Sequence, residues 1–249
     1  MTNERNDHPV LELIDVSKSF GTVDILDGVT LRAGPDSIIC LLGPNGSGKT
    51  TLLSIAGGLL EADSGTVQRR GEDGRSVGYL PQRPAFRPRF TVRETIEFYG
   101  RLVPCAVDVE GVLRRVGLDG VADRRVEHLS GGMTRLLGLA QATIGSPPLV
   151  VLDEPASGLD PQLRRHIARV IADLATGGTA VVVATHDLVA TDRIADEIRI
   201  LDSGSFVARG SPDALRAETG KDTLDDVLDT VIERESEIGV RRGIGGADR

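Results

Sequence analysis

The sequence predicts an α/β fold with a mostly parallel sheet, an antiparallel β part and an inserted α-helical part. Two continuous runs, 149–154, which is apolar up to two terminal carboxylates, and 180–184, are typical of parallel strands buried on both faces. A third run, 38–42, leads into a glycine-rich loop and then into a helical run, 51–56. From about residue 83 to residue 145 helical patterns replace strands, so this segment separates two strand-rich parts of the chain.

Antiparallel strands are expected near both ends of the core. Residues 11–16 alternate between apolar and polar side chains, as a half-exposed strand does, and residues 198–210 form an expected hairpin. Phe20 and Gly21 end the first of these segments, so Phe20 lies just before a turn. Its ring could stack on a purine or cap the core, and the residues alone favour neither. Further short strands are expected at 29–33, 64–67 and 77–80.

The loop after the strand 38–42 matches the phosphate-binding pattern G-x-x-x-x-G-K-[ST]. It consists of Gly43, Pro44, Asn45, Gly46, Ser47, Gly48, Lys49, Thr50 and Thr51. Between a strand and a helix, such a loop points backbone N–H groups at an anion, and its glycines allow a close approach. We expect Lys49 to neutralise the β- and γ-phosphates and the Thr50 hydroxyl to bind Mg²⁺. The sequence therefore predicts a P-loop NTPase core with a nucleotide site.

Composition excludes several classes of protein. A chain of 249 residues is long enough to bury a substantial core, and its net charge of -8 argues against a nucleic-acid partner. Its two cysteines, Cys40 and Cys105, have no metal-binding or redox spacing. No apolar run approaches the roughly 18 residues of a membrane span, and the N-terminus does not resemble a signal peptide. We expect a cytoplasmic protein that reaches a membrane only through a partner.

The helical segment begins with a recognisable start signal. Thr91 and Glu94 form a capping box that opens an amphipathic helix, and a second helix is expected over 109–116. A basic cluster precedes and overlaps the first helix. A solvated face is the favoured interpretation, and a docking surface for a membrane partner is the alternative. The cluster consists of Arg83, Arg87, Arg89 and Arg93.

A second helix start with anion-binding character lies at 129–133. Ser130 is the expected N-cap of a helical run from 134 to 144. Gly131 and Gly132 would leave N–H groups exposed at the positive end of that helix. The chain thus carries two candidate anion sites.

Polar side chains follow two of the buried strands. The run 149–154 ends in Asp153 and Glu154, at the edge where open α/β sheets bind ligands. We expect Asp153 to hold Mg²⁺ through water, and Glu154 to point to the other side and polarise a water molecule. His186 follows the strand 180–184. A lone histidine is usually structural, but Lys49, Glu154 and His186 at three strand ends favour a functional role.

The ordered set of motifs resembles the nucleotide-binding subunit of an ATP-binding cassette (ABC) transporter, over roughly residues 10–215. The resemblance implies that Phe20 stacks on adenine and that 43–51 is the Walker A loop. Gln82 would be the glutamine that senses Mg²⁺ and the membrane partner. It further implies that 129–133 is the signature motif, with Ser130, Gly131 and Gly132 facing the γ-phosphate. Asp153 would be the Walker B acid, Glu154 the catalytic base, 157–160 the D-loop and His186 the switch histidine.

Met133 departs from this family pattern, which most often has glutamine there. A thioether cannot donate a hydrogen bond, so no such bond is expected from this side chain.

The resemblance also implies partners and a location. Two chains would form a head-to-tail dimer around two ATP molecules, as a homodimer or with a similar subunit. The dimer would drive an integral-membrane permease, and the chain would lie on the inner face of the cell membrane. The signature variant resembles the exporter-type branch of the family. Direction and cargo do not follow from this chain.

The motifs divide the chain into four predicted parts. Residues 1–82 form the first part of the ATP-binding core, 83–146 the helical subdomain and 147–216 the second part of the core. Residues 217–249 are expected to form an amphipathic helix that packs on the core, with partner docking as the alternative, and a disordered tail from Gly239. The apolar residues of this helix are Leu224, Val227, Leu228, Val231 and Ile232.

Three rival classes fit the motifs less well. A soluble ABC ATPase of the DNA-repair or chromosome-structure type would carry a coiled-coil insertion, and a translation-factor cassette protein would carry two cassettes. A P-loop kinase or GTPase would lack the signature, and the guanine-reading N-K-x-D motif does not occur. A transporter subunit is the favoured class, and a soluble non-transport ABC ATPase is the alternative.

Overall fold

A six-stranded sheet forms the centre of the protein in this computed structural model, which describes residues 9–70 and 76–244. Strands β5, β6, β7, β3 and β8 are parallel in this spatial order, and β9 is antiparallel to β8. The prediction of an α/β fold with a mostly parallel sheet is confirmed. The strands are β3 (Ile38–Leu42), β5 (Val77–Leu80), β6 (Leu149–Asp153), β7 (Ala180–Ala184), β8 (Glu197–Asp202) and β9 (Ser205–Gly210).

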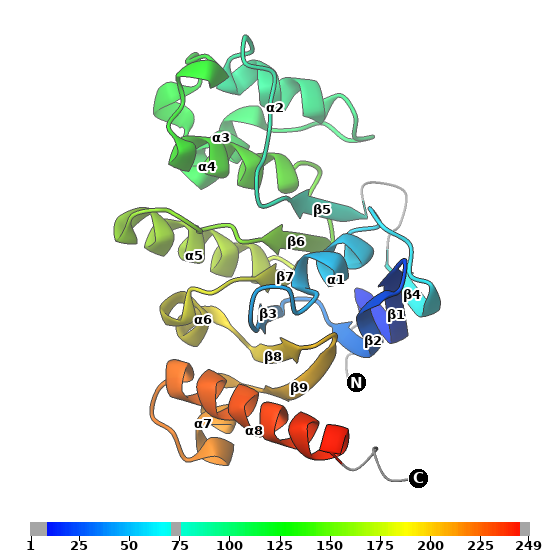
Figure 1. The fold of residues 1–249 in the computed structure, drawn as a ribbon. Helices are drawn as coiled ribbons and strands as arrows, with labels where there is room; N and C mark the ends of the chain where they lie inside the picture. The colour runs from blue at the N-terminus through cyan, green and yellow to red at the C-terminus, as the bar shows by residue number, and fades with distance from the viewer. Residues whose placement is uncertain (1–8, 71–75, 245–249) are drawn as a thin grey trace, which may run out of the picture.

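A smaller antiparallel sheet packs beside the central one (Figure 1). Its order is β2 (Val23–Ala33), β1 (Leu11–Phe20) and β4 (Ser64–Arg69). Strand β1 contains the alternating residues 11–16 and ends at Phe20, where the segment was expected to end, with register shifts along its pairing with β2. Such bulges re-aim side chains without ending a strand.

The central strands are buried on both faces, which explains their continuous apolar character. Val151 and Val182 pack with helix α1 (Lys49–Ala56) and the small sheet. The neighbouring residues Val150 and Val183 point to the opposite face and belong to the core formed with α4 (Gly131–Ala142) and α5 (Pro161–Ala175). Successive side chains of a strand alternate between faces, so both faces need apolar residues. Because β3, β6 and β7 are parallel, the residues that follow these three strands lie at the same edge of the sheet.

Three helices between β5 and β6 form the part at the top of Figure 1. They are α2 (Val92–Gly100), α3 (Val109–Val116) and α4 (Gly131–Ala142). The predicted capping box is present, because Thr91 accepts from the Glu94 N–H while Glu94 accepts from the Thr91 N–H. Asp108 caps α3, and Gly117 ends it in the left-handed region. The division of the chain at 83 and 146 stays a prediction.

The remaining helices follow β6, β7 and β9. They are α5 (Pro161–Ala175), α6 (Leu188–Ile194), α7 (Pro212–Thr219) and α8 (Leu224–Ile244). The apolar face of α8 packs on the core through Leu224, Val227 and Val231. The prediction of disorder from Gly239 is wrong as far as Ile244, because the helix continues and extending a formed helix costs less than starting one. Residues 245–249 of that prediction lie outside the described part of the chain.

Within the described ranges, no helix is long and apolar enough to cross a membrane.

Candidate functional site

The phosphate loop connects β3 to α1 and depends on its glycines. Gly43, Gly46 and Gly48 have φ values of 138°, 83° and 105°, which residues with a side chain rarely adopt. A Cβ at Gly43 would lie 2.0 Å from the carbonyl oxygen of Leu201, and a Cβ at Gly48 would lie 2.8 Å from that of Ile25. Helix α1 begins at Lys49, two residues before the prediction.

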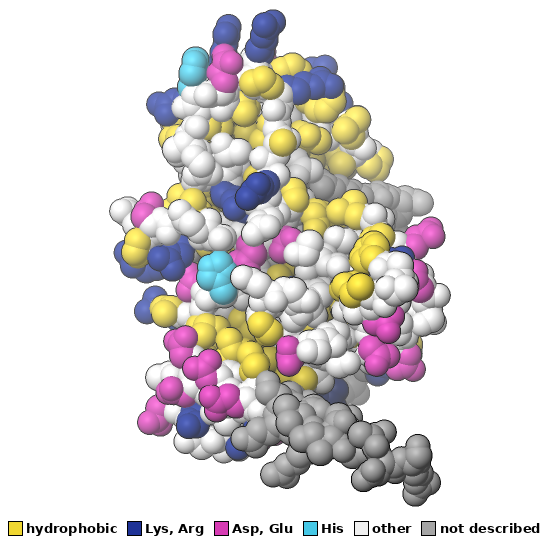
Figure 2. Space-filling model, in the orientation of Figure 1, with side chains coloured by type: hydrophobic (Ala, Val, Ile, Leu, Met, Phe, Trp, Pro, Cys, Tyr) yellow, Lys and Arg dark blue, Asp and Glu magenta, His cyan; other side chains and the backbone are white. Residues whose placement is uncertain are grey.

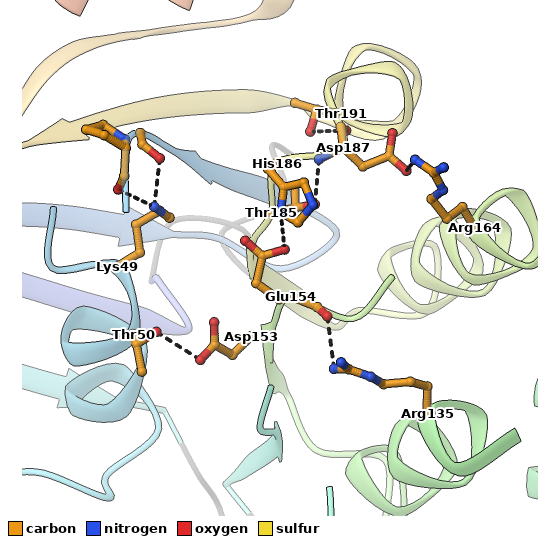
Figure 3. A network of polar contacts seen from close by, with 12 residues as sticks. Lys49, Thr50, Arg135, Asp153, Glu154, Arg164, Thr185, His186, Asp187 and Thr191 are labelled. Atoms are coloured by element: carbon orange, nitrogen blue, oxygen red, sulfur yellow. Dashed lines mark hydrogen bonds and ion pairs between the residues drawn. The ribbon is translucent and has the colours of Figure 1, made fainter. Parts of the chain in front are cut away.

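Lys49 folds back over the loop. Its Nζ donates to the carbonyl oxygens of Gly43 and Pro44, at 2.7 and 2.8 Å (Figure 3). Burial lowers the pKa of Lys49, and the carboxylates of Glu154 and Asp153 act in the opposite direction. The charge therefore lies in a partly desolvated position, where it interacts strongly with an anion.

Two further features of the loop fit a phosphate chain. The hydroxyl of Ser47 is buried and, among the described residues, has no hydrogen-bond partner. Buried polar groups normally have a hydrogen-bond partner, so an oxygen-rich ligand would supply the partner that the Ser47 hydroxyl lacks. No described side chain caps α1, whose N-cap is Gly48, and the N–H groups of the first turn stay available to an anion.

Thr50 and Asp153 bring two oxygen atoms together from different elements. The Thr50 hydroxyl donates to Oδ2 of Asp153 at 3.0 Å. Asp153 is 3% exposed, and burial raises its pKa, while the hydrogen bond from Thr50 opposes this effect. Hydroxyl and carboxylate oxygens suit Mg²⁺, which takes few protein ligands and completes its shell with phosphates and water. The described residues contain no group of three histidines, cysteines or acids that could hold a metal alone, in keeping with such a shared site.

Glu154 follows Asp153 in a rare backbone conformation. Its φ is 50°, in the left-handed region that residues other than glycine seldom adopt. Its N–H donates to the carbonyl oxygen of Ala184 at the end of β7, at 2.9 Å. The side chains of Asp153 and Glu154 point in different directions in Figure 3, as the sequence analysis expected. The turn after β6 therefore separates the two carboxylates.

His186 lies against Glu154. Nδ1 of the imidazole is 2.8 Å from Oε2 of Glu154, and the imidazole is largely exposed. The loop that carries His186 is fixed through the next residue. The Asp187 N–H donates to Thr185 Oγ1, and the Asp187 carboxylate caps α6. Lys49, Asp153, Glu154 and His186 thus gather at the carboxyl ends of β3, β6 and β7.

Other predicted site residues lie outside this group. Phe20 ends β1 and is 52% exposed, with Nζ of Lys18 5.6 Å from its ring centroid. The interpretation of Phe20 as a core cap is therefore wrong, while stacking on a ligand stays a prediction. Gln82 is exposed two residues after β5.

Ser130 begins α4, as predicted. Its Oγ accepts from the Met133 N–H at 3.3 Å, so its described contacts stay within the first turn of the helix. Gly132 is buried, and a Cβ there would lie 2.2 Å from Cδ2 of Leu163, whereas a Cβ at Gly131 would meet nothing. The Met133 sulfur is 3.8 Å from Nη1 of Arg124, where it accepts rather than donates.

Arg135 was not among the predicted site residues. This residue lies on α4, and its Nη1 donates to the carbonyl oxygen of Glu154 at 3.0 Å. The only signal was an arginine five residues after the Ser130 cap, inside a helical run, and nothing in that pattern indicates a contact with β6.

Comparisons with known proteins agree with the geometry. The model of the family described as "ABC transporter" matches residues 26–157, which is 132 of the 249 residues. The chain belongs to the ABC transporter family. As a member of this family it is an ATP-binding P-loop ATPase.

Two curated relatives carry export or resistance names. The chain is 36% identical to "Nod factor export ATP-binding protein I" of Paraburkholderia xenovorans (strain LB400), over 86% of this chain and 75% of the relative. It is also 36% identical to "Daunorubicin resistance ATP-binding protein DrrA3" of Streptomyces coeruleorubidus, over 85% of this chain and 71% of the relative.

Solved ABC cassettes share the fold. An ATP-binding subunit of an ABC transporter superposes with a TM-score of 0.80 and 26% identity, covering 90% of this chain and 99% of that one. A dimeric cassette in a post-hydrolysis state with ADP and Pi superposes with a TM-score of 0.73. It is 24% identical and covers 81% of this chain and 98% of that chain, so it shows the likeness of fold alone.

Proposed function

We propose that this ABC ATPase works as a dimer with two composite ATP sites and drives a separate membrane permease that exports its cargo. The observation that carries the proposal is the gathering of Lys49, Asp153, Glu154 and His186 at one sheet edge. Each chain therefore supplies half of a site: Lys49 is the cation that binds phosphates, the Asp153 carboxylate binds the metal, and the Glu154 carboxylate binds the attacking water. Phosphoryl transfer needs these groups, because its catalysis consists mainly of positioning and charge neutralisation.

The residues divide the chemistry among them. Lys49 leaves the carbonyl oxygens of Gly43 and Pro44 and binds the β- and γ-phosphates, where the N-terminus of α1 adds its N–H groups. Thr50 and Asp153 would hold Mg²⁺, which when bound neutralises charge on the phosphate oxygens. Glu154 orients a water molecule and accepts its proton, and His186 contacts the γ-phosphate. Phe20 stacks on the adenine, and Gln82 responds to the metal and to the permease.

The second half of each site comes from α4 of the other chain. Ser130 and the N–H groups of Gly131 and Gly132 offer a positive helix end, whose described contacts do not include the phosphate loop of the same chain. The solved dimeric cassette with ADP and Pi lends support, because it concerns a protein with the same fold. Either two copies of this chain or this chain and a similar subunit form the dimer.

The helical segment is the proposed contact with the permease. Between 83 and 146 it carries 10 arginines and 7 acids, a net charge of +3 in a chain whose total is -8. Arg87 stacks its guanidinium 4.3 Å from the ring centroid of Phe98 and 5.1 Å from that of Phe90. Figure 2 shows basic side chains gathered over this end of the molecule. A basic, aromatic surface suits a partner beside anionic lipid, which supports a location on the cytoplasmic face of the membrane as part of the proposal.

The names of the relatives support export as the direction. They concern Nod factor export and daunorubicin resistance, and both relatives match most of this chain.

A complementation experiment tests the composite dimer. Lys49→Ala and Ser130→Arg each inactivate both sites of a homodimer. In a mixed dimer the two defects fall in the same composite site and leave the other site intact, so we expect mixing to restore ATP hydrolysis. Two inactive homodimers that stay inactive on mixing, although tagged chains co-purify as mixed dimers, would contradict the composite arrangement.

The permease is tested by its capture. The Glu154→Gln chain, held with ATP, is expected to retain an integral-membrane protein during purification, and the parent chain without nucleotide should retain less. If no membrane protein is retained, the chain acts as a soluble ABC ATPase and the transport proposal fails.

A further inference from the structure

Arg135 joins two parts of the protein that the motifs treat separately. It lies on α4, the helix that Ser130 opens, and its guanidinium reaches the carboxyl end of β6. Figure 3 shows the side chain extending from its helix to the carbonyl oxygen of Glu154, to which Nη1 donates at 3.0 Å. The contact therefore links the signature helix to the backbone of the proposed base.

The backbone of Glu154 needs such support. Its φ of 50° is unfavourable for a residue with a side chain, and conformations of this kind persist where the surroundings hold them. Its N–H is fixed by the carbonyl oxygen of Ala184 at 2.9 Å. Its carbonyl oxygen also accepts from the Ser157 N–H, at 3.3 Å, within the turn that follows. The Arg135 bond is shorter and charge-assisted, and it comes from outside the turn.

The surroundings of Arg135 favour a fixed guanidinium. The side chain is half-buried, and burial lowers the pKa of its guanidinium, while the carboxylates of Glu154 and Asp153 act in the opposite direction. An exposed arginine would sample many rotamers, but this one is held between a helix and a strand end. Its position changes when α4 moves relative to β6.

We propose that Arg135 is a positioning residue, which holds the Glu154 backbone in its unfavourable conformation when α4 is in place. The inference rests on the proposed role of Glu154 as the base that activates water. In the proposed dimer, α4 serves the ATP of the other chain, while Glu154 serves the ATP of its own. Arg135 thereby connects the two ATP sites within one chain.

Steady-state ATP hydrolysis by Arg135→Met and Arg135→Lys tests the proposal. Arg135→Met removes the donor and keeps an unbranched side chain, so we expect kcat to fall about 10- to 100-fold and KM for ATP to change less than about twofold. Arg135→Lys keeps one charged donor and should recover part of the loss. Arg169→Met, an exposed arginine on α5, is the matched control and should keep the parent kcat.

The same substitution in a Glu154→Gln background separates positioning from a general structural effect. Since Arg135 acts through Glu154, Arg135→Met should not slow single-turnover hydrolysis further in that background. An equal loss in both backgrounds, a parent-like kcat for Arg135→Met, or a rise in KM without a fall in kcat would overturn the proposal. Should Arg135→Met unfold, Arg135→Gln takes its place, because it removes the charge and shortens the side chain, and a folded Arg135→Gln with less than a twofold loss of kcat also overturns the proposal.

The outcome is distinguishable from a failure of the proposed function. If Glu154→Gln itself hydrolysed ATP like the parent, the role of Glu154 would be wrong whatever Arg135 does. A large loss in Glu154→Gln together with no loss in Arg135→Met would refute only the positioning role.

Discussion

Nδ1 of His186 and Oε2 of Glu154 lie 2.8 Å apart, so the imidazole that follows β7 faces the carboxylate that follows β6. Both side chains are placed by hydrogen bonds at the strand ends: the Glu154 N–H donates to the carbonyl oxygen of Ala184, and the Asp187 N–H, next to His186, donates to Thr185 Oγ1. The pair is therefore assembled by the parallel pairing of β6 with β7.

This pairing leads to a prediction for His186. His186→Ala should lower kcat for ATP hydrolysis by about 10²-fold or more, because a single well-placed donor to developing negative charge has an effect of that size. ATP binding should change little, since Lys49 and the loop are untouched. Turnover and equilibrium nucleotide binding check the two statements, and a parent-like kcat would remove His186 from the mechanism.

The charge of Lys49 should decide affinity for ATP. Lys49→Met exchanges its partly buried ammonium for an apolar group, and we expect the affinity for ATP to fall at least about 10-fold, since one charge-assisted contact accounts for that much. Lys221→Met, an exposed lysine between α7 and α8, is the matched control. Titration with a fluorescent nucleotide measures both, and equal affinities would show that Lys49 does not meet the phosphates.

Asp153 should destabilise the nucleotide-free protein at neutral pH. Burial raises the pKa of this carboxyl in the folded state, so its charge is unfavourable there above the folded pKa, and the cost disappears as pH falls through that pKa. Asp153→Asn keeps an acceptor for Thr50 and removes the charge. It should therefore raise Tm at pH 7.5 but not well below the folded pKa. A lower Tm for Asp153→Asn at pH 7.5 would contradict this.

Gly132 and Gly131 should differ in their tolerance of a methyl group. A Cβ at Gly132 would lie 2.2 Å from Cδ2 of Leu163, so Gly132→Ala should destabilise the fold by about 1–3 kcal/mol. Gly131→Ala has open space around its Cβ and is the control. Denaturant unfolding measures both variants, and equal stabilities would show that α4 and α5 do not pack as closely as described.

The sequence predicted features that depend on neighbours along the chain. The capping box at Thr91, the cap at Ser130, and the apolar strands β6 and β7 all follow from local patterns, and all are present. The polar residues after the strands could also be grouped in advance, because parallel strands bring their carboxyl ends to one edge.

Contacts between distant segments could not be predicted in this way. Gly43 needs to be glycine because of the carbonyl oxygen of Leu201, which lies far away in the sequence. The bond from Arg135 to Glu154 depends on how α4 crosses the end of β6, and no spacing in the sequence encodes that crossing. The continuation of α8 past Gly239 was missed because glycine is a poor helix former, although a helix already formed can extend through it.

Glu154→Gln tests the central claim most directly. Glutamine preserves the size of the side chain and removes the carboxylate that accepts a proton, so kcat should fall roughly 10²- to 10⁴-fold. ATP should still bind, and in the absence of hydrolysis it should shift the chain to a dimer in size-exclusion chromatography. Loss of turnover together with an ATP-dependent dimer is the predicted result, and hydrolysis at the parent rate would contradict the role of Glu154.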